Sequence, residues 1–368
     1  MSNVSEEYPS RNSENSTSDP SARRPEEGSA QGLIRAGDTD FLRKMLKDAP
    51  AAPPRPLNKE NAKSLTHATK KILDVADQVR DEPPTPEELA FMARELVQCT
   101  LPHSDPGQVP FWQRRNGNLT LSIVPGFDPK GMKLVGYPYG SIPRLLIFWV
   151  TTEALRTGSP RLHLGFSYDA FLRELGLNPN TGGGKRSDAQ RVREQTRRLF
   201  AASISFIQNI GTSEVEGERR INMHVADRSE LWWNPKHPEQ IDLWDSWVEL
   251  GRYFYEAIIQ APVPVDIRAL HALKRSPLAL DLYAWATHKA FTAATKGKAQ
   301  FVSWRALMTQ FGADYTDPKD FKKKIQDALR KIQAVYPGLK LGLADGGILV
   351  LPTSRPAVDR RPAKRSPV

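Results

Sequence analysis

Apolar and polar positions divide the chain into a patterned body between two unpatterned ends. Residues 1–57 are rich in Ser, Glu, Arg, Pro and Ala, so they cannot bury enough surface to offset chain entropy. We expect disorder there, interrupted by a short helix at Asp40–Leu46, and again in the basic tail 354–368. Residues 58–85 have a helical composition that ends in a run of prolines.

Three changes of period follow. Pro86 and the two glutamates after it predict the start of a helix that runs through Leu96. Strict alternation over Leu119–Ile123 predicts a strand. A longer apolar helix is predicted to begin at Ser141, with proline in its first turn, and to end near Gly158.

The segment after this helix has the order strand, helix, glycine-rich turn, helix, hairpin. Ser167 is expected to cap the first short helix, and Gly176 to end it with a positive φ. The next helix is predicted to start near Ser187, and a hairpin follows with its tip at Gly211–Arg220. This order is typical of a winged helix.

The same pattern returns 136 positions later, which indicates an internal repeat. The coincident residues are Leu146 and Leu282, Trp149 and Trp285, Thr151 and Thr287, Ala154 and Ala290, Ser167 and Ser303, Ala170 and Ala306, and Gly176 and Gly312. In the second copy Asp317–Pro318 opens the long helix, and Asp345–Gly346 predicts the turn of the final hairpin.

We therefore predict an α+β fold of tandem winged-helix domains, related by a two-fold internal repeat, with disordered N- and C-terminal tails. The predicted parts are a disordered region at 1–57, a helical linker at 58–85, a first winged-helix domain at 86–230, a Trp-rich inter-domain segment at 231–260, a second winged-helix domain at 261–353 and a basic tail at 354–368.

Charge gives the first indication of a partner. The chain has 52 Lys and Arg against 42 Asp and Glu, a net charge of +10. Such a surplus favours polyanions, because cationic side chains release counterions from phosphate backbones. Cys99 is the only cysteine and the histidines are scattered, so we expect neither a disulfide, a metal nor a cofactor. Without an 18-residue apolar run or an apolar signal core, we expect a cytoplasmic protein and no membrane span.

A DNA-reading helix must show an apolar face to its own core and a basic face to the major groove. The second-copy helix does this, with Phe321, Ile325 and Ile332 on its apolar stripe. The predicted DNA contacts on its other side are Lys319, Lys322, Lys323, Gln326 and Arg330, with Lys324 beside them. A solvated basic face is the alternative interpretation.

The corresponding first-copy helix is also basic. Its predicted DNA contacts are Lys185, Arg186, Arg191, Arg197 and Arg198. For these residues, a solvated basic helix face is as good an interpretation as DNA reading. Contact with the phosphate backbone or the support of a homodimer is a further alternative.

The sequence argues against three other kinds of site. Lys185 does not belong to a nucleotide phosphate loop, because Pro179 stands at the first glycine position and no Ser or Thr follows the lysine. Trp232, Trp233, Trp244 and Trp247 favour packing over single-strand stacking. A relaxase needs a His–hydrophobe–His pair and a primase needs an acidic cluster, and neither pattern is present, so we expect no catalytic residue.

Several segments resemble the plasmid-encoded RepA replication protein family. They are Leu101–Pro106, Arg114–Gly117, Gly136–Arg144, Leu199–Ile204 and Ser276–Tyr283. The resemblance covers roughly Leu89–Pro352 and implies an initiator that binds double-stranded origin DNA and recruits host replication proteins, a helicase or an initiator.

By similarity to other tandem winged-helix initiators, the second domain would read repeated origin sites, and the first would support dimerisation and backbone contact. The same two domains would serve equally in a transcriptional regulator, which is the alternative function.

Overall fold

The computed structural model describes residues 67–128, 130–165, 167–181, 184, 187–212, 214–232, 246–312 and 315–358. The disorder predicted for residues 1–57, the short helix at Asp40–Leu46 and the end of the basic tail lie outside the described residues. Lys185, Arg186, Trp233 and Trp244 lie outside them as well.

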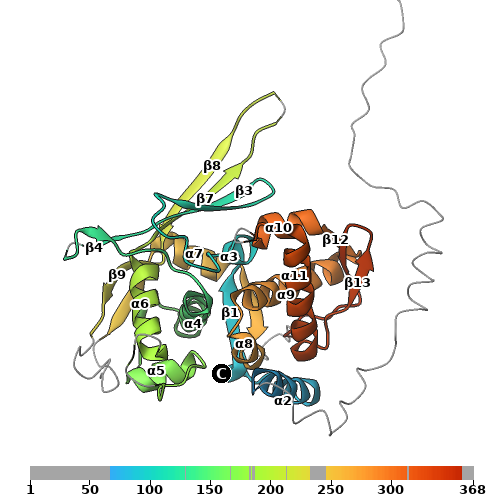
Figure 1. The fold of residues 1–368 in the computed structure, drawn as a ribbon, viewed down its shortest axis with the longest axis horizontal. Coiled ribbons are helices and arrows are strands. Elements are labelled where there is room, and N and C mark those ends of the chain that lie inside the picture. The colour runs from blue at the N-terminus through green and yellow to red at the C-terminus, as the bar shows by residue number, and fades with distance from the viewer. Residues whose placement is uncertain are drawn as a thin grey trace, which may run out of the picture. The chain divides into compact units, whose positions relative to one another are not determined.

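The first half of the described chain runs to the end of β9 (Figure 1). Its elements are α2 (His67–Asp81), η2 (Pro86–Glu88), β1 (Leu89–Ala93), α3 (Arg94–Gln98), β2 (Trp112–Asn116), β3 (Leu119–Val124), β4 (Phe127–Asp128), β5 (Lys133–Leu134), α4 (Ser141–Thr157), β6 (Arg161–His163), α5 (Tyr168–Glu174), α6 (Asp188–Ala201), β7 (Ser203–Asn209), β8 (Glu218–His224) and β9 (Ala226–Glu230).

The second half begins with β10 and ends in a short hairpin. Its elements are β10 (Trp247–Leu250), α7 (Arg252–Gln260), β11 (Pro262–Asp266), α8 (Ile267–Leu273), α9 (Pro277–Lys296), β12 (Gln300–Ser303), α10 (Trp304–Phe311), α11 (Pro318–Val335), β13 (Leu341–Ala344) and β14 (Gly347–Val350). The architecture is mixed α and β, as predicted.

Five small antiparallel sheets connect these elements. Their strand orders are β2-β3-β7-β8, β6-β10-β9, β12-β14-β13, β1-β11 and β4-β5. The β7–β8 pair extends as a long hairpin away from the helices (Figure 1).

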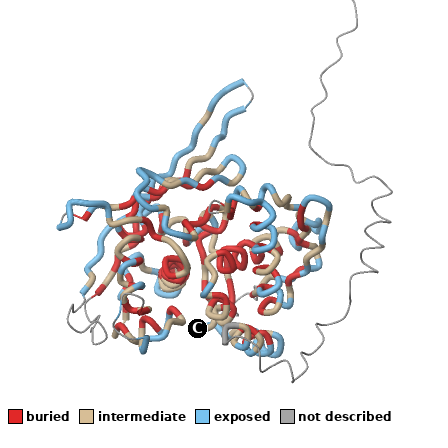
Figure 2. The backbone as a smooth tube through the Cα atoms, viewed as in Figure 1, coloured by how far each residue is buried: buried red, intermediate tan, exposed pale blue. Residues whose placement is uncertain are grey.

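Helices α4 and α9 form the centre of the two halves. Ser141 and Pro277, their first residues, stand at the predicted separation of 136 positions, as do Tyr168 and Trp304 at the starts of α5 and α10. Both central helices are buried on most sides, and an apolar helix of this kind belongs in a core. Figure 2 shows the buried segments meeting in this central region.

The two copies differ in how their strands pair. In the second half, β12 and the β13–β14 hairpin form one sheet. In the first half, β6 pairs with β10, while the β7–β8 hairpin joins β3 and β2. The first copy has therefore kept the predicted element order but has distributed its strands between two sheets.

The two glycines predicted to end equivalent helices behave differently. Gly176 has φ +69°, as predicted, and the N–H of Leu177 bonds back to the carbonyl of Leu172. Its equivalence to Gly176 predicts a positive φ for Gly312 as well, and this is wrong, because Gly312 has φ −98°. Its N–H donates to the carbonyl of Met308 at 2.7 Å, which prolongs the helical turn by one residue.

The helix predicted from Pro86 to Leu96 is wrong. Only Pro86–Glu88 forms a helical turn, and Leu89–Ala93 is strand β1 before the short α3 begins. The cause is long-range pairing: β1 lies antiparallel to β11, with Leu89 opposite Asp266. A strand partner far away in the sequence has overridden the local helical pattern.

This β1–β11 pair joins the two halves, and α2 packs against α8 and α11 of the second half. The buried apolar side chains form one continuous cluster, and Leu65–Val368 is one compact unit. The buried apolar side chains of the two copies therefore belong to one continuous core.

The folded chain also extends past residue 353, where the basic tail was predicted to begin. Ser354 is buried, and its hydroxyl accepts from the backbone N–H of Lys340 at 3.0 Å. The hydroxyl of Tyr336 donates to the carbonyl of Arg355 at 2.6 Å. These contacts hold the first residues of the predicted tail against α11.

The predicted inter-domain segment 231–260 contains β10 and α7. Helix α7 buries Phe254 and Ile258 and packs against β8 and α4. Trp247 stacks beneath the guanidinium of Arg161 at 4.0 Å, whereas Trp232 is exposed.

Candidate nucleic-acid interface

Helix α11 is the main candidate for a nucleic-acid contact. The side chain of Asp317 caps its start by accepting from the N–H of Lys319 at 2.8 Å, and Pro318 occupies the first turn. The predicted apolar stripe is buried and faces α9, α8 and α2. The stripe fixes which side of α11 is left for solvent.

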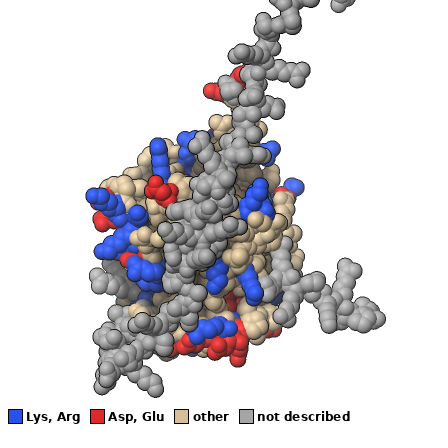
Figure 3. All heavy atoms as spheres, turned by 90° about the vertical axis from the view of Figure 1, so that its right-hand side faces the viewer, with Lys and Arg blue, Asp and Glu red and all other residues tan. Residues whose placement is uncertain are grey.

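That free side is basic. Lys319, Lys322, Lys323, Lys324 and Arg330 are exposed, and Gln326 is half-buried. The positions 319, 323, 326 and 330 follow one another at intervals of three or four, so they lie along one face of the helix. Figure 3 shows Lys and Arg side chains spread over the side of the molecule that carries α11.

The basic side chains of α11 differ in what they already contact. Arg330 forms an ion pair with Asp327, and the ammonium of Lys322 lies 5.2 Å above the ring of Trp304. Lys319 and Lys323 form no ion pair with any residue that the structure describes. They are therefore available to an incoming anion without breaking an existing contact.

Two neighbouring elements frame α11. Ser303 caps α10 by accepting from the N–H of Ala306 at 3.1 Å, which places Trp304 beside Lys322. The β13–β14 hairpin turns at Gly346, whose φ is +73°, and exposes 61% of Leu343. The sequence predicted both the cap and the turn, but the Trp304–Lys322 contact required the folded chain.

The first-copy helix α6 presents fewer free cations. Ser187 caps it by accepting from the N–H of Gln190 at 3.2 Å. Arg191 is exposed and lies 3.4 Å from the carboxylate of Asp188. Arg197 forms a 2.7 Å ion pair with Asp128, and this hydrogen bond holds the pKa of that carboxyl below its usual value.

The guanidinium of Arg198 already has partners within the chain. Only 16% of its side chain is exposed, and its guanidinium contacts Glu194 at 2.9 Å and Asp105 at 3.3 Å. It also donates to the carbonyl of Tyr137 at 3.2 Å. The loop segments around residues 105 and 137 cover this face of α6. From the helical periodicity alone, the face is expected to be exposed.

A buried charge cluster lies behind these helices, between the two halves. The guanidinium of Arg144 donates to both carboxylate oxygens of Asp281, at 2.7 and 2.8 Å. Its remaining N–H groups donate to the carbonyls of Leu101, Pro102 and Gly140. His103 Nε2 lies 2.9 Å from Asp281 Oδ2.

Burial and charge set the protonation of this cluster. Burial alone raises the pKa of Asp281, but the charge of Arg144 and the hydrogen bonds from His103 and Arg144 outweigh it and keep the pKa below its usual value. Burial lowers the pKa of His103. His103, Arg144 and Asp281 come from three of the segments that resemble the RepA family, yet sequence reasoning singled out none of them.

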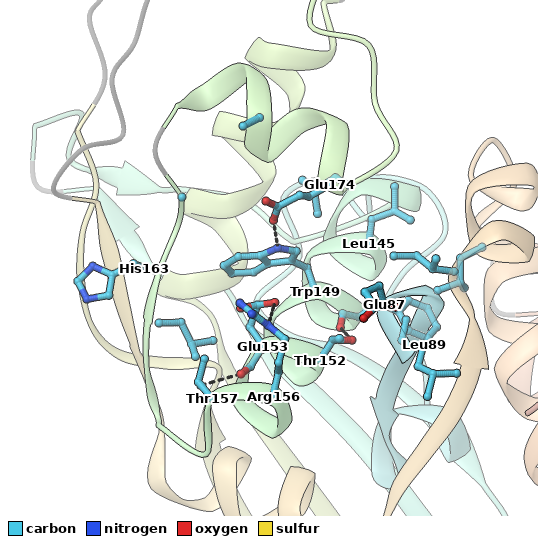
Figure 4. Close-up of a pocket in the computed structure, with 18 of the residues that line it drawn as sticks. Glu87, Leu89, Leu145, Trp149, Thr152, Glu153, Arg156, Thr157, His163 and Glu174 are labelled. Carbon is cyan, nitrogen blue, oxygen red and sulfur yellow. Dashed lines mark hydrogen bonds and ion pairs between the residues drawn. The ribbon is translucent and has the colours of Figure 1, made fainter. Parts of the chain in front are cut away.

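A second feature, an apolar cavity of about 1050 Å³, lies between α4, α5, β1 and α8 (Figure 4). Leu145, Leu89 and Trp149 line it, and the indole of Trp149 donates to Glu174 at 2.7 Å. Glu87 and Glu153 also face this space. Its lining is mainly apolar, and the two arginines in it are already engaged, Arg156 by Glu153 and Arg161 by the ring of Trp247.

Other kinds of site are not found in the part of the chain that the structure describes. Its described residues contain no group of three or more His, Cys, Asp or Glu side chains placed to hold a metal ion. Among the described helices, none is both long enough and apolar enough to cross a membrane.

The fold and these faces define an α+β protein with a lysine-covered helix as its candidate nucleic-acid contact. Residues 137–306 match the family described as Plasmid encoded RepA protein, which confirms the resemblance carried by the sequence segments. No curated protein matches the chain.

Two solved structures are distantly similar. A crystal structure of RctB domains 2-3 (RctB-155-483) has a TM-score of 0.41, and one of selenomethionine derivatives of RctB domains 2 and 3 has a TM-score of 0.43. Each is 10% identical and covers 69% of this chain and 94% of that chain.

Proposed function

We propose that this protein is a plasmid replication initiator that binds double-stranded origin DNA and recruits host replication proteins. The single observation that carries the proposal is the exposed lysine face of α11, in a chain whose residues 137–306 match the RepA family. On this face Lys319 and Lys323 form no ion pair with any described residue. Binding of this kind needs no catalytic group, metal or cofactor, and an initiator of this kind acts in the cytoplasm.

We assign a winged helix to each copy. The support is strongest in the second half, where helix, strand, two helices and hairpin follow in order and β12-β14-β13 forms one sheet. In that arrangement α11 is the recognition helix and the β13–β14 hairpin is the wing. In the first half α6 takes the equivalent place, with the β7–β8 hairpin beyond it.

The chemistry of α11 fits contact with a major groove. Lysines on one face meet phosphates and guanine edges, and Gln326 supplies an amide that can pair with adenine. Phosphate contacts fix the position of a protein on DNA, whereas base contacts specify the sequence. We therefore assign sequence reading, on repeated origin sites, to α11.

Arg191 and Arg197 of α6 are assigned backbone contact or the support of a homodimer. Both already have a carboxylate partner, at 3.4 and 2.7 Å, which favours a positioning role over base reading.

Competition binding tests this function. A labelled origin fragment is competed with unlabelled origin or random DNA, using wild type, the double variant Lys319→Ala with Lys323→Ala, and Lys298→Ala as a control. Lys298 is an exposed lysine outside α11. The double variant should lose origin affinity by more than it loses random-DNA affinity, and the control should change neither.

Equal affinity of wild type for origin and random DNA would reject sequence-specific binding. Maintenance of a plasmid that carries the origin fragment then separates an initiator from a transcriptional regulator, because only an initiator supports replication of that plasmid.

A further inference from the structure

A second basic feature lies away from the exposed face of α11, in a cleft of about 720 Å³ where the two halves meet. Four segments far apart in the sequence line it: α2, the first turn of α4, the turn that leads into α6, and the end of α8. The charged residues of the lining are Lys71, Asp188, Arg191, Lys274 and Arg275.

The cations of this cleft outnumber its carboxylates. Among the described residues that line the cleft, Asp188 is the only carboxylate. It is already engaged by Arg191 at 3.4 Å and by the N–H of Asn178 at 3.2 Å. Within the described part of the chain, Lys71, Lys274 and Arg275 form no ion pair. Three cationic side chains therefore share one recess without a paired anion.

Lys274 is one example of this unpaired positive charge. Its ammonium is half-buried and donates to the carbonyl of Gly176 in the other half. Burial, followed by the charge of Lys71, lowers the pKa of Lys274. Like charges gathered in a recess destabilise the empty cleft, and an anion that enters relieves this repulsion.

Uncharged donors converge on the same space. Ser141 and Ile142 belong to the first turn of α4, and no side chain caps that helix. The lining also includes the amide of Asn178, whereas the hydroxyl of Thr181 already donates to the carbonyl of Asn178 at 3.3 Å. Many donors in several directions match a phosphate, which has several acceptor oxygens, better than they match a single carboxylate.

From this placement we propose that the cleft between α2, α4, α6 and α8 binds a phosphate group. The group belongs either to the backbone of bound DNA or to a free pyrophosphate-bearing molecule such as a nucleotide. The chemistry required is the same in both cases. The cleft stands independently of the DNA-reading role proposed for α11, because it shares none of the residues of that face.

Two probes separate the sources. Pyrophosphate binding is measured by calorimetry, and duplex DNA of random sequence is titrated at several salt concentrations. The variants are Arg275→Gln and Lys71→Gln, and Lys298→Gln is the control with the same charge change. Arg275 and Lys298 are both exposed, so the unfolding midpoints of these variants should stay close to wild type.

If the cleft takes a free phosphate compound, wild type and control bind pyrophosphate and each cleft variant binds roughly tenfold more weakly. If it takes the DNA backbone, each cleft variant lowers the slope of log affinity against log salt by about one, for any DNA sequence. Either result supports the cleft.

The proposal is overturned if both cleft variants match the control with both probes, including the case in which all proteins bind pyrophosphate equally. Its failure is distinct from failure of the proposed function. Loss of origin preference through Lys319 and Lys323 depends on α11 alone, whereas the pyrophosphate titration contains no DNA.

Discussion

Arg144 and Asp281, which are 137 positions apart in the chain, form a bidentate ion pair that joins the two halves of the protein. Arg144 lies in the first turn of α4 and Asp281 in the second turn of α9, so the repeated helices are tied together at nearly equivalent places. Both side chains are almost fully buried, at 2% and 6% exposed. Desolvation offsets much of the attraction in such a pair, so its main effect is to fix how the halves meet.

Removing one partner of this pair should destabilise the protein strongly. Asp281→Asn leaves the Arg144 guanidinium buried beside a neutral amide, and we expect a loss of about 3–5 kcal/mol in the free energy of unfolding. Denaturation by urea measures it. Asp327→Asn is the matched control, because Asp327 pairs with Arg330 on the exposed side of α11 and should change stability by less than about 1 kcal/mol.

A loss below about 1 kcal/mol for Asp281→Asn would show that the carboxylate does not hold the two halves. A more selective check replaces both partners by apolar residues, Arg144→Met with Asp281→Leu. This pair of changes leaves no uncompensated charge, but it removes the donors of the Leu101, Pro102 and Gly140 carbonyls, so we expect it to destabilise the protein as well.

The free energy of unfolding should fall as the pH is lowered from about 6.5 towards 4, because in this range His271 is neutral in the folded protein but protonated in the unfolded chain. Burial, followed by the charge of Lys274, lowers the pKa of His271 to about 4, against about 6.5 in an unfolded chain. Between these values the unfolded chain binds more protons. The stabilisation by neutral His271 is therefore complete above pH 6.5 and is lost as the pH falls towards 4. At pH 5 the free energy of unfolding should already have fallen by about 2 kcal/mol.

Urea titrations from pH 7 to pH 5 in phosphate-free buffer test this, because phosphate would occupy the proposed cleft. His271→Gln should flatten the pH dependence, while His163→Gln, at an exposed histidine, should leave it as in wild type. If His271→Gln keeps the full slope, other groups are responsible for it.

Gly176 and Gly158 offer a clean comparison at the junction of the halves. Both have positive φ, +69° and +65°, so alanine strains the backbone at both positions by about 1 kcal/mol. A Cβ at Gly176 would lie 2.4 Å from the ring of His271, whereas a Cβ at Gly158 meets nothing within 4 Å. Thermal melts should show a loss of more than about 2 kcal/mol for Gly176→Ala and about 1 kcal/mol for Gly158→Ala. Equal losses at the two positions would mean that His271 and α8 move to accommodate the new Cβ without further loss of stability.

The contrast between Gly176 and Gly312 shows how far the repeat could be predicted. The sequence located both helices and both ends, because caps and apolar spacing are local signals. It could not show that Gly312 keeps a negative φ, since that depends on the hydrogen bond to Met308 and on the following turn. A valine at Gly312 is still expected to destabilise, because its Cβ would lie 2.6 Å from the carbonyl oxygen of Met308.

The larger failures of prediction arise from contacts between distant segments. Strand β1 has a helical pattern and becomes a strand only because β11 pairs with it. Arg198 lies on the polar side of a predicted helix, yet Asp105 and Tyr137, from two earlier loops, bond to it. Arg144 and Asp281 each stand in a recognisable segment, but periodicity gives no sign that they meet. Charge pattern alone identified the face of α11, because that face depends on one helix.

The last prediction concerns the division of labour between α11 and α6. Lys323 has no ion-pair partner among the described residues, whereas Arg197 is held by Asp128 at 2.7 Å. If α11 reads bases, Lys323→Ala should lower the ratio of origin to random-DNA affinity, by about 1–3 kcal/mol for a good base contact.

If α6 contacts only phosphates, Arg197→Ala should weaken binding to both DNAs alike and reduce the salt slope by about one, because a phosphate contact carries no sequence information. Competition binding of both variants on both DNAs, repeated at three salt concentrations, measures the two effects together. Asp128→Asn is the informative companion, because it frees Arg197 without removing its charge and should strengthen binding to both DNAs. A relaxed specificity in Arg197→Ala, with Lys323→Ala unchanged, would assign sequence reading to the first copy instead.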